Sequence, residues 1–144
     1  MKKFNKSGGF TLIELLVVIG IIAILAAIVI VSINPAKRFM DARQSQRQAN
    51  VESILNAIQQ SIVDEDGEIC TEITTTVQDI SNTEADLKTC LADYLAVLPT
   101  DPQDATGDVL TSTYNTGYTV VKNAEGQVTV DAPGTEGDPI SVTR

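Results

Sequence analysis

Residues 8–33 read GGFTLIELLVVIGIIAILAAIVIVSI, and this stretch decides the architecture of the chain. The 24 residues from Phe10 to Ile33 contain a single charged side chain, Glu14. As an α-helix this run would reach about 36 Å, which is enough to cross a hydrocarbon core about 30 Å thick. The sequence therefore predicts a helix that spans a membrane.

The apolar run differs from a secretory signal peptide, which is shorter and ends in a small-x-small cleavage site. Its alanines, at positions 23, 26 and 27, form no A-x-A pair, and the run continues to Ile33. We therefore expect the run to be retained. Three lysines precede it and four basic residues follow it closely, namely Lys2, Lys3 and Lys6, then Lys37, Arg38, Arg43 and Arg47. This balance does not decide the orientation in the membrane.

Glu14 is the one charge in the run, four residues after Phe10. An acid at the centre of a span costs roughly 2.5–3.5 kcal/mol on insertion scales, and less near an end. Two interpretations follow. The carboxylate stays hydrated near the interface, or it has a partner inside the membrane. The residue chemistry alone leaves both open.

The segment from Lys2 to Leu15 resembles the class III leader of type IV prepilins and type II secretion pseudopilins. That leader has basic residues, a glycine at the cut, a phenylalanine next, an acid shortly after it and an unbroken apolar run. The matching positions are Lys2, Lys3, Gly8, Gly9, Phe10, Thr11, Leu12, Ile13, Glu14 and Leu15. The resemblance is close over the leader and the first helix, and looser over the remainder.

The resemblance implies that a prepilin peptidase cuts between Gly9 and Phe10 on the cytoplasmic side of the membrane. The same enzyme usually methylates the new amine of Phe10. The apolar helix is then kept, first as a membrane anchor and later as the core of a helical filament. In related filaments the acid faces the positive N-terminal amine of its own or an adjacent subunit, so Glu14 is expected to serve assembly.

Charge is strongly segregated along the chain. The net charge is −9, and residues 64–144 alone carry −13, from sixteen acids and three bases. Such a region repels nucleic acid, so we expect no nucleic-acid partner. The chain has no histidine, which removes the commonest general base and the commonest metal ligand. We therefore expect no enzyme and no cofactor.

Residues 34–63 are expected to continue the helix as an amphipathic segment. An apolar stripe falls at helical spacing, at Val51, Ile54, Leu55, Ile58 and Ile62. Pro35 follows the span directly, and it marks either a helix boundary or a kink inside one long helix. The acidic run at 64–66 and Gly67 are expected to end the helix.

Residues 64–144 are expected to form a small head. A short amphipathic helix is predicted around residues 83–98, with Thr83 as its N-cap. Two alternating segments, Tyr118–Lys122 and Gln127–Asp131, flank a turn and predict a β-hairpin. Residues 109–114 and 140–143 are weaker strand candidates. Cys70 and Cys90 are expected to form a disulfide, because zinc requires four ligands and an exported domain is oxidised.

The expected fold class is therefore α+β, with a long N-terminal helix and a head whose small antiparallel sheet packs on the apolar stripe. The parts are a cleaved basic leader (1–9), a membrane and filament-core helix (10–33), its amphipathic continuation (34–63) and the globular head (64–144).

Asp101, Asp104 and Asp108 lie together in one loop of the head. Several major pseudopilins bind calcium in a comparable loop, and hard cations favour such oxygens. The segment does not reproduce the glycine and aromatic pattern that the family shows after its Asp-Pro. We therefore favour a solvated acidic loop and predict no metal site.

The expected function is that of a structural subunit of a type IV pilus-like filament. The alternative is a pseudopilin of a type II secretion system or a competence pseudopilus, which uses the same anchor. Expected partners are further copies of the chain, the prepilin peptidase, the membrane, and a pilus or secretion assembly platform. The expected location is the bacterial cytoplasmic membrane for the single-pass precursor, and then an extracellular or periplasmic filament.

Overall fold

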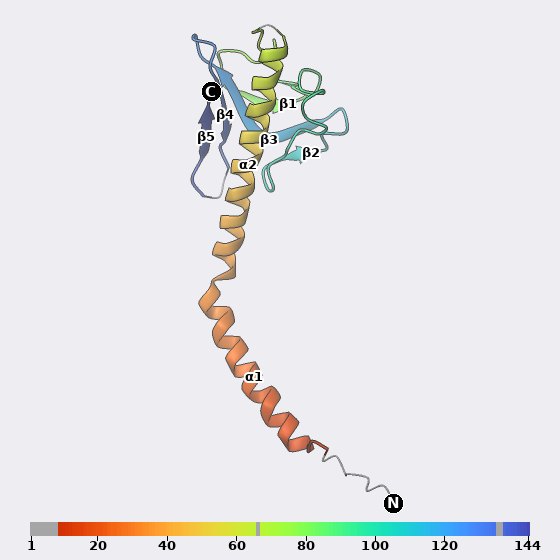
Figure 1. The fold of residues 1–144 in the computed structure, drawn as a ribbon, viewed down its shortest axis with the longest axis vertical. Helices are drawn as coiled ribbons and strands as arrows, with labels where there is room; N and C mark the ends of the chain where they lie inside the picture. The colour runs from red at the N-terminus through yellow and green to blue at the C-terminus, as the bar shows by residue number, and fades with distance from the viewer. Residues whose placement is uncertain (1–8, 66, 135–136) are drawn as a thin grey trace, which may run out of the picture. The chain divides into compact units, whose positions relative to one another are not determined.

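The computed structural model describes residues 9–65, 67–134 and 137–144, and it divides the chain into two compact units (Figure 1). The first unit is Met1–Phe39 and the second is Met40–Arg144. The basic leader through Gly8 lies outside the described residues. The elements are two helices followed by an antiparallel sheet, so the expected α+β class is confirmed.

Helix α1 (Leu12–Ile33) contains 22 residues, none of them buried within the chain. It is long and apolar enough to cross a membrane. It ends at Asn34, whose backbone is left-handed with φ of 47°. Asparagine tolerates this conformation better than most residues, because its side chain bonds locally to the backbone.

Helix α2 (Pro35–Asp64) begins directly after Asn34. The Asn34 side-chain oxygen accepts the backbone N–H of Lys37 at 3.4 Å, so Asn34 also caps α2. Pro35 takes the first helical position, where its missing N–H leaves no bond unmade. Of the two interpretations of Pro35, the structure therefore has a helix boundary, and the left-handed residue at the boundary is Asn34.

The apolar stripe of α2 faces the core of the second unit. Val51, Ile54, Leu55 and Ile58 are fully buried, and Ile62 packs at the edge. The prediction of the stripe is confirmed. The helix ends at Asp64, and the N–H of Gly67 donates to the carbonyl of Ile62 at 2.7 Å. Gly67 has φ of 97°, which suits glycine at a helix end.

The sheet has the strand order β1-β3-β4-β5, and β2 pairs with β3 as well. The strands are β1 (Gln78–Ser81), β2 (Thr106–Gly107), β3 (Tyr114–Lys122), β4 (Val128–Ala132) and β5 (Ile140–Thr143). The part of α2 in the second unit lies along the sheet (Figure 1). Alternate residues of β3 and β4 are buried, which is typical of a sheet with one face on a core.

The predicted hairpin is confirmed as β3 and β4, with Lys122 opposite Val128. The Asn123 side chain accepts the N–H groups of Glu125 and Gln127 and closes the turn. The strand expected at 140–143 is β5. Strand β1 is not among the strands that the sequence predicted.

The strand expected at 109–114 is wrong over most of its length. Only Tyr114 belongs to a strand, and residues 109–113 form a turn in which the Thr111 N–H donates to the Asp108 carbonyl at 2.8 Å. Val109 is buried here as part of the head core. Val109 is therefore buried by a folded-back loop and not by an extended strand, and residues 110–113 are exposed.

The short helix expected at residues 83–98 is also wrong, because the chain forms successive turns over 87–94. Leu87 and Leu91 are buried, as the apolar spacing predicted, but the backbone between them does not form a helix. The Asp86 carboxylate accepts the Tyr114 hydroxyl at 2.7 Å. A short helix is costly to nucleate, so tertiary contacts decide the backbone of such a segment.

Cys70 and Cys90 form a disulfide, as the sequence predicted. Their Cα atoms are 6.0 Å apart and the bond closes a sequence separation of 20. The bond joins the segment that follows α2 to the turns at 87–94. It therefore cross-links two segments that are neither helix nor strand, one on each side of β1 in the chain.

Candidate processing and assembly site

The expected cleavage position lies in non-helical chain immediately before α1. Gly9, Phe10 and Thr11 precede the first helical residue, Leu12. Phe10 is 85% exposed, and a side chain added at Gly9 would meet nothing within 4 Å. A protease needs an extended and accessible segment, because the chain must enter its cleft. The geometry at Gly9 and Phe10 suits such a cut.

Glu14 is held by Thr11 in a capping box at the start of α1. The Glu14 carboxylate accepts the Thr11 backbone N–H at 2.8 Å and the Thr11 hydroxyl at 2.7 Å. The Glu14 N–H donates back to the Thr11 hydroxyl oxygen at 3.3 Å. The sequence analysis missed the role of Thr11, although the Thr-x-x-Glu spacing is the signal for a capping box.

The capping box fixes where the acid of α1 points. The carboxylate folds back to the N–H of Thr11, one residue from the nitrogen of Phe10. A carboxylate at this end of a helix also interacts favourably with the helix dipole. Glu14 is therefore stabilised within its own chain, and it accepts the N–H of the residue that directly follows Phe10, whose nitrogen a cut after Gly9 would turn into an amine.

The remainder of α1 offers an apolar surface that its own unit does not cover. Its large side chains, from Leu12 to Ile33, are all at least half exposed. Water penalises such a surface strongly, because every buried methylene contributes about 0.8 kcal/mol. Lipid or other apolar helices must therefore surround it.

Residues 4–30 match the family model of the prokaryotic N-terminal methylation motif. The chain carries a class III prepilin leader. This leader is that of type IV pilins and pseudopilins, and it implies processing by a prepilin peptidase and assembly at a membrane. With the apolar helix that follows, it indicates a membrane-anchored precursor. No curated protein and no solved structure matches the chain.

The acidic loop of the head takes a form that the sequence analysis did not expect. Asp101 is buried, and its carboxylate pairs with Arg47 of α2. The Arg47 Nε lies 2.6 Å from Asp101 Oδ2, and its Nη2 lies 3.2 Å from Oδ1. Nη2 also lies 3.5 Å from a carboxylate oxygen of Asp104. The expectation of a solvated loop is therefore wrong for Asp101.

Backbone groups complete the environment of the buried carboxylate. Asp101 Oδ1 accepts the N–H of Gln103 at 2.8 Å and of Asp104 at 2.9 Å. Burial raises the pKa of Asp101, but the hydrogen bonds from Arg47 and these two N–H groups outweigh it and lower the pKa below its ordinary value. The hydrogen bond to Asp101 raises the pKa of Arg47. Both groups are charged at neutral pH.

The three acids of the loop do not act together. Asp101 and Asp104 face the guanidinium of Arg47, whereas Asp108 accepts the N–H of Leu110 at 2.9 Å. Arg47 therefore supplies the positive charge that this loop requires. The sequence analysis had counted Arg47 only among the basic residues that follow the span, and no local pattern identifies its partner.

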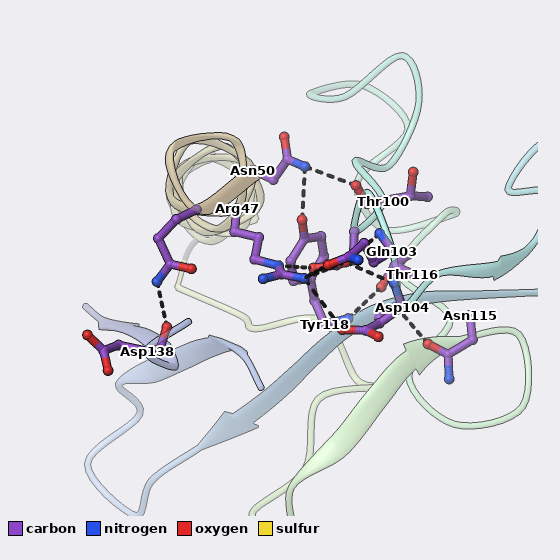
Figure 2. Close-up of polar contacts among 12 residues, drawn as sticks. Arg47, Asn50, Thr100, Gln103, Asp104, Asn115, Thr116, Tyr118 and Asp138 are labelled. Carbon is purple, nitrogen blue, oxygen red and sulfur yellow. Dashed lines mark hydrogen bonds and ion pairs between the residues drawn. The ribbon is translucent and has the colours of Figure 1, made fainter. Parts of the chain in front are cut away.

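Asn50 lies one turn of α2 beyond Arg47 and extends the same cluster. Its amide donates to the Thr100 carbonyl at 3.0 Å and to the Tyr118 hydroxyl at 2.9 Å. Figure 2 shows these contacts between α2, the loop and β3. The cluster therefore ties α2 to the loop and to β3.

Proposed function

We propose that this chain is a structural subunit of a type IV pilus-like filament, cut between Gly9 and Phe10 and polymerised through α1. The observation that carries the proposal is an apolar helix with no residue buried in its own chain, directly after a prepilin leader. Lipid covers such a helix in the precursor, and neighbouring helices cover it in a filament. The partners are further copies of the chain, a prepilin peptidase and an assembly platform. We propose no enzymatic role.

Within this proposal Glu14 serves assembly. The cut after Gly9 creates a positive amine on Phe10, and a methyl group on this amine leaves its charge unchanged. In a filament core of low dielectric constant, carboxylate and amine attract each other strongly, whereas an unpaired charge is costly. The capping box already directs the carboxylate to the helix end where the amine appears. The pair can form with the amine of the same subunit or of a neighbour.

The test is Glu14→Leu in the full chain, made in cells that contain a prepilin peptidase and an assembly machine. The variant is more apolar, so insertion and processing should persist. The amine of Phe10 loses its partner, and breaking one side of a buried pair costs about 3–5 kcal/mol at each added subunit. We expect a mature protein that begins at methylated Phe10, measured by intact mass, and few or no filaments.

Ile13→Leu is the matched control, because it changes an apolar neighbour and keeps the charge. Its filament yield, measured by shearing and compared with the membrane pool, should equal that of the unchanged protein. Normal yield from Glu14→Leu alone would refute the assembly role of Glu14. An uncut chain, or a mature terminus beyond Ile33, would refute the proposed processing.

A further inference from the structure

The head carries an apolar groove that no part of the described head fills. The groove has a volume of about 230 Å³. Leu91, Leu98 and Val109 are its buried floor, and Val97 and Leu110 are its exposed rim, with Leu110 76% exposed. We name these residues, with Lys88 at one side, the head groove. A cavity of roughly 150 Å³ with apolar walls accepts benzene, so the head groove can accept an aromatic side chain.

The one polar side chain that lines the head groove, Lys88, has its ammonium engaged by other groups of the head. The Lys88 ammonium donates to the Thr111 carbonyl at 2.8 Å and lies 4.9 Å from the centre of the Tyr114 ring. Two exposed acids adjoin the groove in sequence, Asp93 after the lining residue Ala92 and Asp108 before Val109. The groove therefore has an apolar floor, and two exposed acids adjoin its lining residues in the chain.

The first turn of α2 has the complementary chemistry. Residues 37–40 read Lys-Arg-Phe-Met, and all four are exposed. Phe39 is 65% exposed, which is unusual for a large aromatic side chain in a helix outside the membrane. We name residues 37–40 the collar. It places two positive charges directly before two apolar side chains.

We infer that the head groove of one subunit binds the collar of a second copy of this chain, with Phe39 in the groove and Lys37 and Arg38 near Asp93 and Asp108. This inference rests on the proposed function, because only an assembly presents a second copy at high local concentration. Two different surfaces meet in such a contact, so it is heterologous, and heterologous contacts that do not close produce open filaments.

Charge favours the second copy over a lipid surface as the occupant. Anionic membranes are recognised by clusters of roughly four to eight basic residues. Of the four basic residues that follow the span, the collar has two, and Arg47 is buried against Asp101. The head, in contrast, holds the excess of acids in the chain, so a collar meets opposite charge on any neighbouring head. Complementary charge of this kind steers association and fixes the register, while the apolar contact holds the pair together.

The test uses the full chain in membranes with its peptidase and assembly machine, and p-benzoylphenylalanine in place of Phe39. After illumination we expect a product of twice the subunit mass, with cross-links in residues 88–98 or 109–110 of a differently tagged copy. The matched control carries the same probe in place of Val77, which is 65% exposed and lies outside the groove and the collar. It should give no cross-link to the groove.

Two sets of variants sharpen the result. Leu110→Ser should lower the cross-link yield at least fivefold, while Val77→Ser should leave it unchanged. Reversal of the collar charges by Lys37→Glu with Arg38→Glu should also lower the yield, and the added changes Asp93→Lys with Asp108→Lys should restore it. The docking would be overturned if Leu110→Ser left the cross-link yield unchanged. It would also be overturned if Asp93→Lys with Asp108→Lys failed to restore the yield of the charge-reversed collar.

The outcomes separate this inference from the proposed function. Filaments that form normally while Phe39 cross-links only to lipid or to another protein would overturn the docking and leave the filament proposal intact. A groove cross-link between two copies without any filament would support the docking and refute the filament. Neither cross-link nor filament would refute both.

Discussion

Replacement of Arg47 by methionine should destabilise the head strongly, because it leaves a buried carboxylate without its cation. The side chains of Arg47 and Asp101 are 2% and 0% exposed, and their shortest contact is 2.6 Å. Loss of one partner of a buried pair costs about 3–5 kcal/mol, whereas exposed pairs contribute far less. Methionine has a similar length and no charge, so the loss is mainly electrostatic.

The assay is urea unfolding of residues 40–144, the compact unit that contains the head core. With a slope of about 1.5 kcal/mol per molar urea, a loss of this size lowers the midpoint by about 2–3 M. Lys122→Met is the control, because it removes a cation from β3 at a half-exposed position. Its midpoint should move by less than about 0.5 M.

A second change tests whether the unpaired charge is the cause. Asp101→Asn keeps an oxygen that can accept the N–H groups of Gln103 and Asp104 and removes the negative charge. Added to Arg47→Met, it should recover most of the lost stability. If the double variant is as unstable as the single one, or if Arg47→Met costs less than about 1 kcal/mol, the reasoning is wrong.

The pH dependence gives an independent check with a defined sign. The pKa of Asp101 is lowered in the folded chain from its ordinary value of 3.8. The stability it contributes is therefore complete above pH 3.8 and is lost as the pH falls through the lower, folded value. In Arg47→Met the Asp101 carboxyl is still buried but has lost the hydrogen bond from Arg47 that lowers its pKa. It therefore takes up a proton more easily than in the unchanged protein. The difference in free energy of unfolding between Arg47→Met and the unchanged protein should therefore become smaller as the pH falls from 7 to 4.

Three further predictions concern the head. Cys70→Ser with Cys90→Ser should lower the free energy of unfolding by about 3 kcal/mol, because a loop of about 20 residues is no longer closed; urea unfolding of oxidised and reduced protein checks this, and equal midpoints would contradict it. The hydrogen bond to Asp64 raises the pKa of Tyr94 to about 12, and the pKa values of Tyr114 and Tyr118 are raised mainly by burial. Absorbance at about 295 nm should show no tyrosinate near pH 10, and Asp64→Asn should move one tyrosine toward lower pH; a full transition near pH 10 in the folded protein would refute the assignment. Gly117→Ala should destabilise the head by more than Gly126→Ala, because both have positive φ but a Cβ at 117 would lie 2.8 Å from the Asp101 Cβ, whereas the nearest atom at 126 is 3.9 Å away; equal melting temperatures of the two variants would contradict this.

The features that depend on near neighbours in the chain could be predicted from the sequence. The apolar run requires a helix of membrane length, because residues 10–33 leave no other way to satisfy the backbone in lipid. The prepilin leader is a linear motif, so its match at residues 4–30 needed no fold. The hairpin of β3 and β4 and the stripe on α2 follow from local period and turn chemistry, and the structure has both.

Contacts between residues far apart in the chain could not be predicted and depend on the complete fold. Arg47 and Asp101 are 54 residues apart, and nothing near either one specifies the other. Strand β1 has no hairpin partner next to it in sequence, since it pairs with β3 across the turns at 87–94. The apolar residues of this segment are spaced as in a helix, but the disulfide at Cys90 and the buried leucines hold its backbone in turns. Local propensity contributes only tenths of a kcal/mol per residue, while burial and ion pairing contribute several, so the long-range contacts prevail.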